Sequence, residues 1–225
     1  MRVLRGRAAD PERDFERTRE LAARVAEAGE SALRAWRPHR QVAFGRRDAR
    51  SDGYDRAREA ARERGYVPLE REVGGRAVAY TGTTVAFALA RPADDRSGIR
   101  DRYAEATDRL RAALASLGVD AREGEPADSF CPGTHSLQAD GKIAGLAQRV
   151  RQDVALVAGV VVVADRDEVA AVLDPVYDAL GVPFDPASVG SVAAAGGPSD
   201  PDATVDALID AFAPDDYRVD RSRET

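Results

Sequence analysis

Apolar residues recur at helical spacing in several segments, each bounded by residues that typically begin or end helices. In the first, Asp10 is a suitable N-cap, Pro11 fits the first helical position, and Phe15, Leu21 and Val25 lie on one face. A later amphipathic segment stops at a glycine, as helices often do. The pattern predicts helices over residues 10–29, 52–65, 97–117, 165–180 and 201–212.

Between these segments lie short apolar or alternating runs that are typical of strands. They cover residues 31–36, 41–44, 66–73, 76–80, 84–90, 120–123, 136–139, 142–150 and 154–164. The first two are joined by Arg37-Pro38-His39-Arg40 and predict a hairpin, and Asp140-Gly141 is a strong turn signal between two later strands. The run 154–164 is apolar on both alternations, which predicts a central strand that is buried on both faces.

Composition and length narrow the class of protein. The 225 residues, with 44% hydrophobic and 32% charged residues, predict one globular domain over 1–225. The net charge of −6, with basic and acidic residues interleaved, argues against nucleic acid as a partner. One cysteine forms no internal disulfide, and no apolar run reaches the roughly 18 residues of a membrane span, so we expect a soluble, cytoplasmic protein without a membrane partner.

The rarest side chains cluster in residues 129–150. This segment holds the single cysteine, Cys131, one of two histidines, His135, and Lys142, which is the one lysine among 33 Lys and Arg residues. A lysine is a compact charge that can enter a narrow pocket and can lose its proton, whereas an arginine is a planar, permanently charged fork. The retained lysine therefore marks a candidate site.

Each of these residues also has a structural interpretation. Cys131 precedes Pro132-Gly133, which favours a turn, but a lone cysteine is often only a small buried hydrophobe. A nearby cation such as Lys142 would favour its thiolate, and His135 could act as a base or simply lie at the surface. One cysteine and two distant histidines do not form a zinc ligand set, so no metal site is predicted.

The pair Gly74-Gly75 lies between two predicted strands. The spacing by itself favours a plain hairpin turn, but without Cβ atoms this backbone could also approach a ligand closely. The pair is not a phosphate loop, since it lacks a following Gly-Lys-Ser/Thr and does not open a helix.

Three ordered motifs resemble those of the lipoate/octanoate protein ligase and transferase superfamily. Residues 141–149, GKIAGLAQR, are similar to the lysine signature of the superfamily. Residues 71–78, REVGGRAV, are similar to its glycine-rich motif, and residues 37–46 are similar to a strand pair that lies upstream of that motif. The loop SFCPGT, residues 129–134, is similar to that of the octanoyl-[H protein] amidotransferase branch, whereas the Asn-Asp of ATP-dependent lipoate ligases is missing. Departures include Tyr80 in place of a frequent His and His135 in place of a Tyr.

The resemblance implies residue roles. Cys131 would carry the acyl group as a thioester, and Lys142 would contact the acyl carbonyl. The substrate-binding positions would be Arg71, Gly74, Gly75, Arg76, Ala77, Gly145 and Ala147. The implied fold is α+β: a mixed, largely antiparallel sheet with outer helices, as in biotin and lipoate ligase catalytic domains and class II synthetases.

The resemblance also implies an activity: transfer of an octanoyl or lipoyl group, without a cofactor, to the lysine of a lipoyl-domain protein. Expected partners are the glycine cleavage H protein and E2 subunits of 2-oxoacid dehydrogenases. One alternative is an ATP- and Mg²⁺-dependent lipoate ligase or its catalytic subunit, with a separate accessory subunit, and a second is a non-catalytic acyl-binding module.

Overall fold

The computed structural model describes residues 1–71, 75–93, 98–151, 153–213 and 217–221. The larger of its two sheets runs β11-β1-β2-β6-β10-β9-β8-β7 and holds the main core. Its strands are β1 (Arg2–Arg5), β2 (Ala32–Trp36), β6 (Val85–Pro92), β7 (Arg122–Glu123), β8 (Ser136–Gln138), β9 (Lys142–Val150), β10 (Val154–Val161) and β11 (Arg218–Arg221). Pairing is antiparallel from β2 to β7 and parallel at β1 with both of its neighbours. The predicted mixed, largely antiparallel sheet is confirmed.

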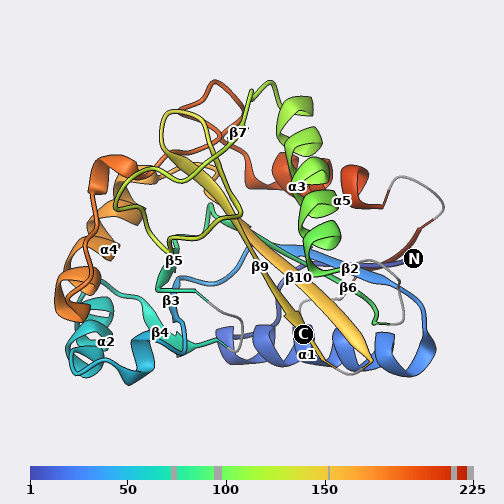
Figure 1. Cartoon of the computed structure of the whole chain (residues 1–225), viewed down its shortest axis with the longest axis horizontal. Coiled ribbons are helices and arrows are strands. Elements are labelled where there is room, and N and C mark those ends of the chain that lie inside the picture. The colour runs from blue at the N-terminus through green and yellow to red at the C-terminus, as the bar shows by residue number, and fades with distance from the viewer. Residues whose placement is uncertain (72–74, 94–97, 152, 214–216, 222–225) are drawn as a thin grey trace.

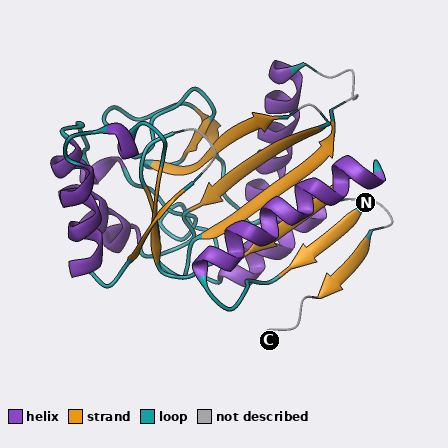
Figure 2. Ribbon diagram, turned by 90° about the horizontal axis from the view of Figure 1, so that it is seen from below, coloured by secondary structure: helices purple, strands orange, loops and turns teal. Residues whose placement is uncertain are grey.

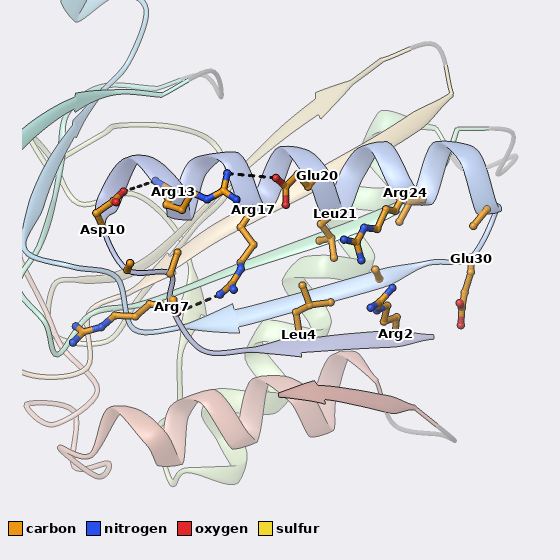
Figure 3. A pocket seen from close by; sticks show the side chains of 15 residues that line it. Arg2, Leu4, Arg7, Asp10, Arg13, Arg17, Glu20, Leu21, Arg24 and Glu30 are labelled. Carbon is orange, nitrogen blue, oxygen red and sulfur yellow. Dashed lines mark hydrogen bonds and ion pairs between the residues drawn. The ribbon is translucent and has the colours of Figure 1, made fainter. Parts of the chain in front are cut away.

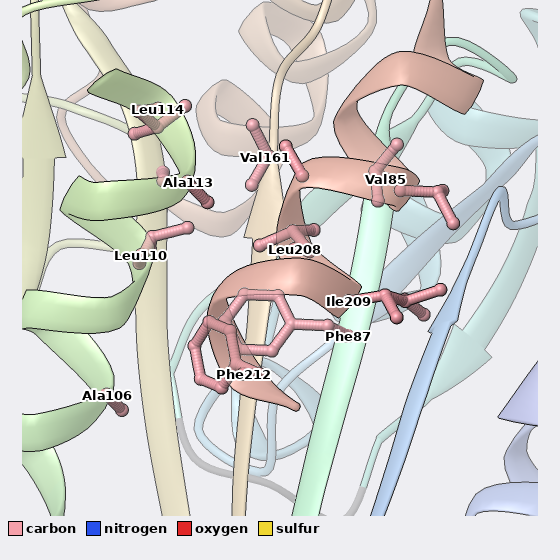
Figure 4. Packing of buried hydrophobic residues seen from close by; sticks show 14 of the residues in the cluster. Val85, Phe87, Ala106, Leu110, Ala113, Leu114, Val161, Leu208, Ile209 and Phe212 are labelled. Carbon is pink, nitrogen blue, oxygen red and sulfur yellow. The ribbon is translucent and has the colours of Figure 1, made fainter. Parts of the chain in front are cut away.

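Helices cover both faces of this sheet (Figures 1 and 2). The helix α1 (Pro11–Ala28) crosses one face, and α3 (Ile99–Ser116) and α5 (Pro201–Phe212) lie together on the other. On the α3/α5 side the odd-numbered positions of β6 pack into the core, where the rings of Phe87 and Phe212 lie 4.9 Å apart (Figure 4). On the α1 side β6 presents Ala86, Ala88 and Ala90 ahead of Pro92, so the side chains beneath the helix are short.

The smaller sheet has the order β4-β3-β5 and packs with the helices α2 (Tyr54–Glu63) and α4 (Arg166–Leu180). Its strands are β3 (Gln41–Phe44), β4 (Val67–Glu70) and β5 (Val78–Tyr80), with β3 parallel to β4 and antiparallel to β5. Short 3-10 turns at Asp48–Arg50 and Pro186–Ser188 complete the elements.

The predicted hairpin over residues 31–44 is wrong, and the hairpin interpretation of Gly74-Gly75 is excluded as well. The strands β2 and β3 follow each other in sequence but belong to different sheets, so residues 37–40 are a crossover and not a hairpin turn. Likewise β4 and β5 do not pair with each other, since β3 lies between them. The partner of each strand depends on burial against distant elements, which local turn chemistry does not record. The terminal strands β1 and β11 were not predicted.

Other local predictions are confirmed. The Asp10 carboxylate accepts a hydrogen bond from the Arg13 backbone N–H, and Gly29 ends α1 with a φ of 67°. The strands β8, β9 and β10 form consecutive antiparallel pairs, and β10 lies between β6 and β9 as a central strand should. No helix in the described part of the chain is both long enough and apolar enough to span a membrane.

Candidate active site

The loop that carries Cys131 has an unusual backbone conformation. Cys131 has a φ of 44°, in the left-handed region that costs a side-chain-bearing residue about 1–2 kcal/mol. Both backbone groups of Cys131 are held: its N–H donates to the Tyr177 hydroxyl, and its carbonyl accepts from Lys142 Nζ at 2.9 Å. The Tyr177 hydroxyl in turn donates to the Ala77 carbonyl at 2.9 Å. The strained conformation is thus fixed by contacts from the two elements that carry Tyr177 and Lys142, α4 and β9.

The Cys131 thiol faces two N–H donors from the segment between β4 and β5. Arg71 Nη2 lies 3.1 Å from Sγ and also donates to the Arg76 carbonyl at 2.6 Å. The Arg76 backbone N–H lies 3.3 Å from the same sulfur. A guanidinium and an amide N–H at these distances stabilise a thiolate and can also stabilise negative charge that develops on a carbonyl oxygen beside it.

Gly75 allows this approach. Its φ is 104°, and a Cβ atom at this position would lie 2.5 Å from the Cys131 sulfur and 2.7 Å from Arg71 Nη2. Gly45 is similarly constrained, because a Cβ there would lie 1.8 Å from the Gly75 carbonyl oxygen. Close approach, rather than a hairpin turn, therefore explains Gly75. Gly74 lies outside the described residues.

Lys142 is a fully buried ammonium at the start of β9, with 1% of its residue surface exposed. Its Nζ donates to Glu125 Oε1 at 2.8 Å and to the carbonyls of Phe130 and Cys131 at 2.8 and 2.9 Å. Three acceptors use all three donors of an ammonium group. Burial lowers the pKa of Lys142, and the hydrogen bond and charge of Glu125 oppose that shift. In this conformation Lys142 holds the Cys131 loop and has no donor left for a substrate oxygen.

Glu125 connects the two ends of this loop. Besides Lys142, it accepts hydrogen bonds from the Ser129 hydroxyl and from the Gly133 backbone N–H, the latter at 3.2 Å. Its carboxylate therefore lies against the whole turn that presents the thiol.

A mostly apolar cavity of about 110 Å³ begins at the thiol and extends over the α1 side of the larger sheet. Small residues from adjacent strands form its floor: Ala86 and Ala88 of β6, Ala158 of β10, and Gly145 and Ala147 of β9. A Cβ on Gly145 would lie 3.4 Å from Lys142 Cε, which is an ordinary van der Waals contact, so the glycine leaves extra room in this part of the cavity. A cavity with small residues along one wall and a thiol in its lining has the shape to bind a slender apolar chain attached to the sulfur.

The structure brings most of the predicted site residues together. Cys131, Lys142, Arg71, Gly145 and Ala147 all line the cavity. Gly75 and Arg76 contact the thiol through their backbone, and Ala77 is fully buried beneath Tyr177. Tyr80 also lines the cavity.

His135 does not join this group. Its ring stacks on Tyr103 of α3, with centroids 3.6 Å apart, and it is absent from the cavity lining. The cation at the thiol is Arg71, where the sequence had suggested Lys142. Tyr177 and Glu125 were missed, because a tyrosine on a helix and a glutamate in a polar loop carry no local signal of their role.

A second groove, of about 490 Å³, lies between α1 and β1 (Figure 3). Its lining includes five arginines and three acidic residues: Arg2, Arg7, Arg13, Arg17, Arg24, Asp10, Glu20 and Glu30. It shares no residue with the cavity at Cys131. The larger groove is therefore separate from the thiol site.

The fold and the site together define an α+β domain, a mixed sheet flanked by helices, with a cysteine thiol in the lining of a mostly apolar cavity. Residues 10–213 match the model of the lipoyl protein ligase A/B catalytic domain, and the chain belongs to this family.

Among curated relatives, the octanoyl-[GcvH]:protein N-octanoyltransferase of Kyrpidia tusciae is 33% identical over 139 residues, which cover 61% of this chain and 48% of that protein. The protein of the same description from Geobacillus kaustophilus is 34% identical over 134 residues, covering 57% and 47%. The chain spans about half the length of the curated relatives it matches.

Solved structures share the fold. A lipoate-protein ligase A bound with ATP superposes with a TM-score of 0.79 at 24% identity, covering 99% of this chain and 89% of that one. A bipartite lipoate protein ligase from Thermoplasma acidophilum, studied with its E2 lipoyl domain, gives a TM-score of 0.70 at 22% identity, covering 99% and 87%. The predicted α+β catalytic-domain fold is confirmed.

Proposed function

We propose that this protein transfers an octanoyl or lipoyl group, through a thioester on Cys131, to the lysine of a lipoyl-domain protein. The observation that carries the proposal is the placement of the Cys131 sulfur at the end of an apolar cavity, facing Arg71 and the Arg76 backbone N–H. Similarity to the octanoyl-[GcvH] transferases supports the same activity and favours the glycine cleavage H protein as a partner, with E2 lipoyl domains as further acceptors.

The first step would be attack by the Cys131 thiolate on the carbonyl carbon of the donor, an acyl thioester or an acyl-lysine amide. Arg71 Nη2 and the Arg76 N–H lie close enough to the sulfur to stabilise the resulting oxyanion. Collapse of the intermediate expels the donor thiolate, or the donor amine after it takes up a proton, and leaves the acyl group on Cys131. The acceptor lysine, as the neutral amine, then attacks this thioester; the amide forms as the C–S bond breaks, and the surplus proton of the amine passes to the departing sulfur or to water.

The cavity supplies the affinity for the acyl chain. At about 0.8 kcal/mol per buried CH₂, the methylenes of an eight-carbon chain contribute on the order of 5 kcal/mol. This apolar term would hold the chain while the polar groups at Cys131 act only on the carbonyl. Lys142 would act by positioning, since its three donors fix Glu125 and the loop carbonyls.

A second candidate function is ATP- and Mg²⁺-dependent ligation of free lipoate, favoured by the fold similarity to a ligase bound with ATP. A buried lysine at this position would serve that chemistry as well, so Cys131 decides between the two candidates.

The test is incubation with an octanoylated glycine cleavage H protein and an apo lipoyl domain, without ATP, followed by intact mass spectrometry. The transferase predicts an acyl adduct on the native protein and octanoylation of the acceptor. Cys131→Ala and Cys131→Ser should form no adduct, while Ser116→Ala, a comparable change at an exposed position of α3, should behave as native. Full transfer by Cys131→Ala, or strict dependence on ATP, would refute the transferase.

A further inference from the structure

The floor of the cavity at Cys131 ends at a single larger side chain, Leu156 of β10. Two neighbouring rows of the larger sheet form the floor nearest the thiol. They consist of glycine, alanine and one valine: Gly145, Val160 and Ala86 in the first row, and Ala147, Ala158 and Ala88 in the second. In the third row β10 contributes Leu156, which also lines the cavity. A leucine extends further from a sheet than an alanine, so the floor rises at the third row.

The sheet register fixes the distance between the thiol end and Leu156. The first row lies at the thiol end, because Gly145 is next to the Lys142 side chain, whose Nζ donates to the Cys131 carbonyl. Four residues of β10 separate Val160 from Leu156, which amounts to about 14 Å. An extended eight-carbon chain, built from bonds of about 1.5 Å, spans roughly 9 Å. Such a chain, attached to the sulfur, therefore ends between the second row and Leu156.

The floor is closed on the side of β2. That strand places Trp36 beside Ala86 and Arg34 beside Ala88. Arg34 is buried, pairs with Asp14 of α1 and lies over the Trp36 ring, 4.0 Å from its centroid. These large side chains block a path across the strands there. The direction that small residues leave open runs along the strands, from the first row toward the third.

A second cavity, of about 330 Å³, begins where the first one ends. The two cavities share Phe15 and Thr18 of α1 and Leu156. The lining of the second cavity continues to Val154 and Arg149, which lie further along β10 and β9 from the thiol. Phe15 and Leu156 thus form an apolar partition between the cavity that holds the thiol and a separate space behind it.

We infer that Leu156, together with Phe15, sets the upper length of the acyl chain at about eight carbons, and that a smaller side chain at position 156 joins the two cavities and admits longer chains. Each methylene that enters an apolar space raises affinity about fourfold, whereas a methylene that meets a filled space must displace its neighbours. The inference rests on the proposed function for the covalent step, but the chain-length limit itself requires only binding.

Fluorescence titration with hexanoate, octanoate, decanoate and dodecanoate tests this limit without any transfer, because Trp36 is the one tryptophan of the chain and lines the cavity. In the native protein, affinity should rise about fourfold per methylene up to octanoate and rise no further beyond it. In Leu156→Ala, the ratio of dodecanoate to octanoate affinity should increase at least tenfold. Ala158→Leu raises the floor one row earlier and should reduce the ratio of octanoate to hexanoate affinity at least tenfold.

Leu117→Ala is the matched control, because it shortens another half-buried leucine that lines neither cavity, and it should keep the native ratios. Circular dichroism checks that each variant is folded, and Ala158→Leu carries the test if Leu156→Ala is not. Native ratios in both cavity variants would overturn the inference. A native affinity that keeps rising through dodecanoate, or the absence of saturable binding by any of the acids, would overturn it as well.

A second measurement separates this inference from the proposed function. The native protein and Leu156→Ala are each mixed with equal amounts of octanoyl- and dodecanoyl-H protein, and the mass of the adduct on Cys131 is read. We expect mainly the octanoyl adduct on the native protein and a larger dodecanoyl share on the variant. Absence of any adduct, with chain-length-dependent binding of the acids intact, would refute the proposed function alone. Adducts with the same dodecanoyl share on both proteins would refute the chain-length limit alone.

Discussion

Replacement of Glu125 by Gln should weaken the loop that presents Cys131. The carboxylate accepts from Lys142 Nζ at 2.8 Å, from the Gly133 N–H and from the Ser129 hydroxyl, and the amide of Gln can replace only part of these interactions. A hydrogen bond to a charged group contributes about 1.5–3 kcal/mol, and the buried Lys142 would lose its counter-charge. Since 23% of the Glu125 side chain is exposed, water can enter, and we expect a loss of about 2–3 kcal/mol.

For a chain of this size, that loss lowers the melting temperature by about 4–12 °C. The variant also has a pH signature. Burial lowers the pKa of Lys142 and Glu125 opposes this, so removing the carboxylate lowers the pKa further and the ammonium is lost at lower pH. The alkaline limb of acyl-enzyme formation should therefore shift to lower pH.

The assays are thermal melting and the rate of Cys131 acylation between pH 6 and about 10, the upper end being set by the ordinary pKa of lysine. Glu123→Gln makes the same chemical change at an exposed carboxylate two residues away and should leave both results unchanged. A Glu125→Gln protein with native melting temperature and a native pH profile would show that Lys142 does not depend on Glu125.

Three further predictions follow from single contacts. Gly75→Ala should reduce Cys131 acylation at least 100-fold, because the added Cβ would clash with the sulfur. Gly82 has a similar φ of 95° but no atom within 4 Å of an added Cβ, so Gly82→Ala should keep its activity. Equal acylation rates of the two variants by mass spectrometry would contradict this prediction. Burial and the hydrogen bond to Glu70 raise the pKa of Tyr54 to about 12. The neutral Tyr54 hydroxyl therefore contributes its full share to the free energy of unfolding below pH 10, and this share is lost as the pH rises from 10 through 12. The melting temperature of Tyr54→Phe should fall less steeply over that range, and a parallel decline would count against it. Asp10→Ala removes the α1 N-cap and should cost about 1 kcal/mol by urea unfolding, an effect that an unchanged midpoint would exclude.

Local features of the sequence determined much of the fold. Amphipathic spacing, the Asp10 cap and the glycine stops located the five α-helices of the described residues, because these signals act over a few residues. The Asp140-Gly141 turn and the apolar run that follows identified three consecutive strands. The rarity of Cys131 and Lys142, together with motif similarity, located the candidate site and the family.

Tertiary structure decided which strands pair with each other and which residue of the site contacts the Cys131 thiol. The strands β2 and β3 entered different sheets because each one found its buried partner far away in the sequence. Residues 71 and 131 are 60 positions apart, so only folding could show that Arg71, rather than Lys142, contacts the thiol. The lining of the cavity arises in the same way, because Asp14, Trp36 and Gln41 come from a helix and two sheets that meet only in the folded chain.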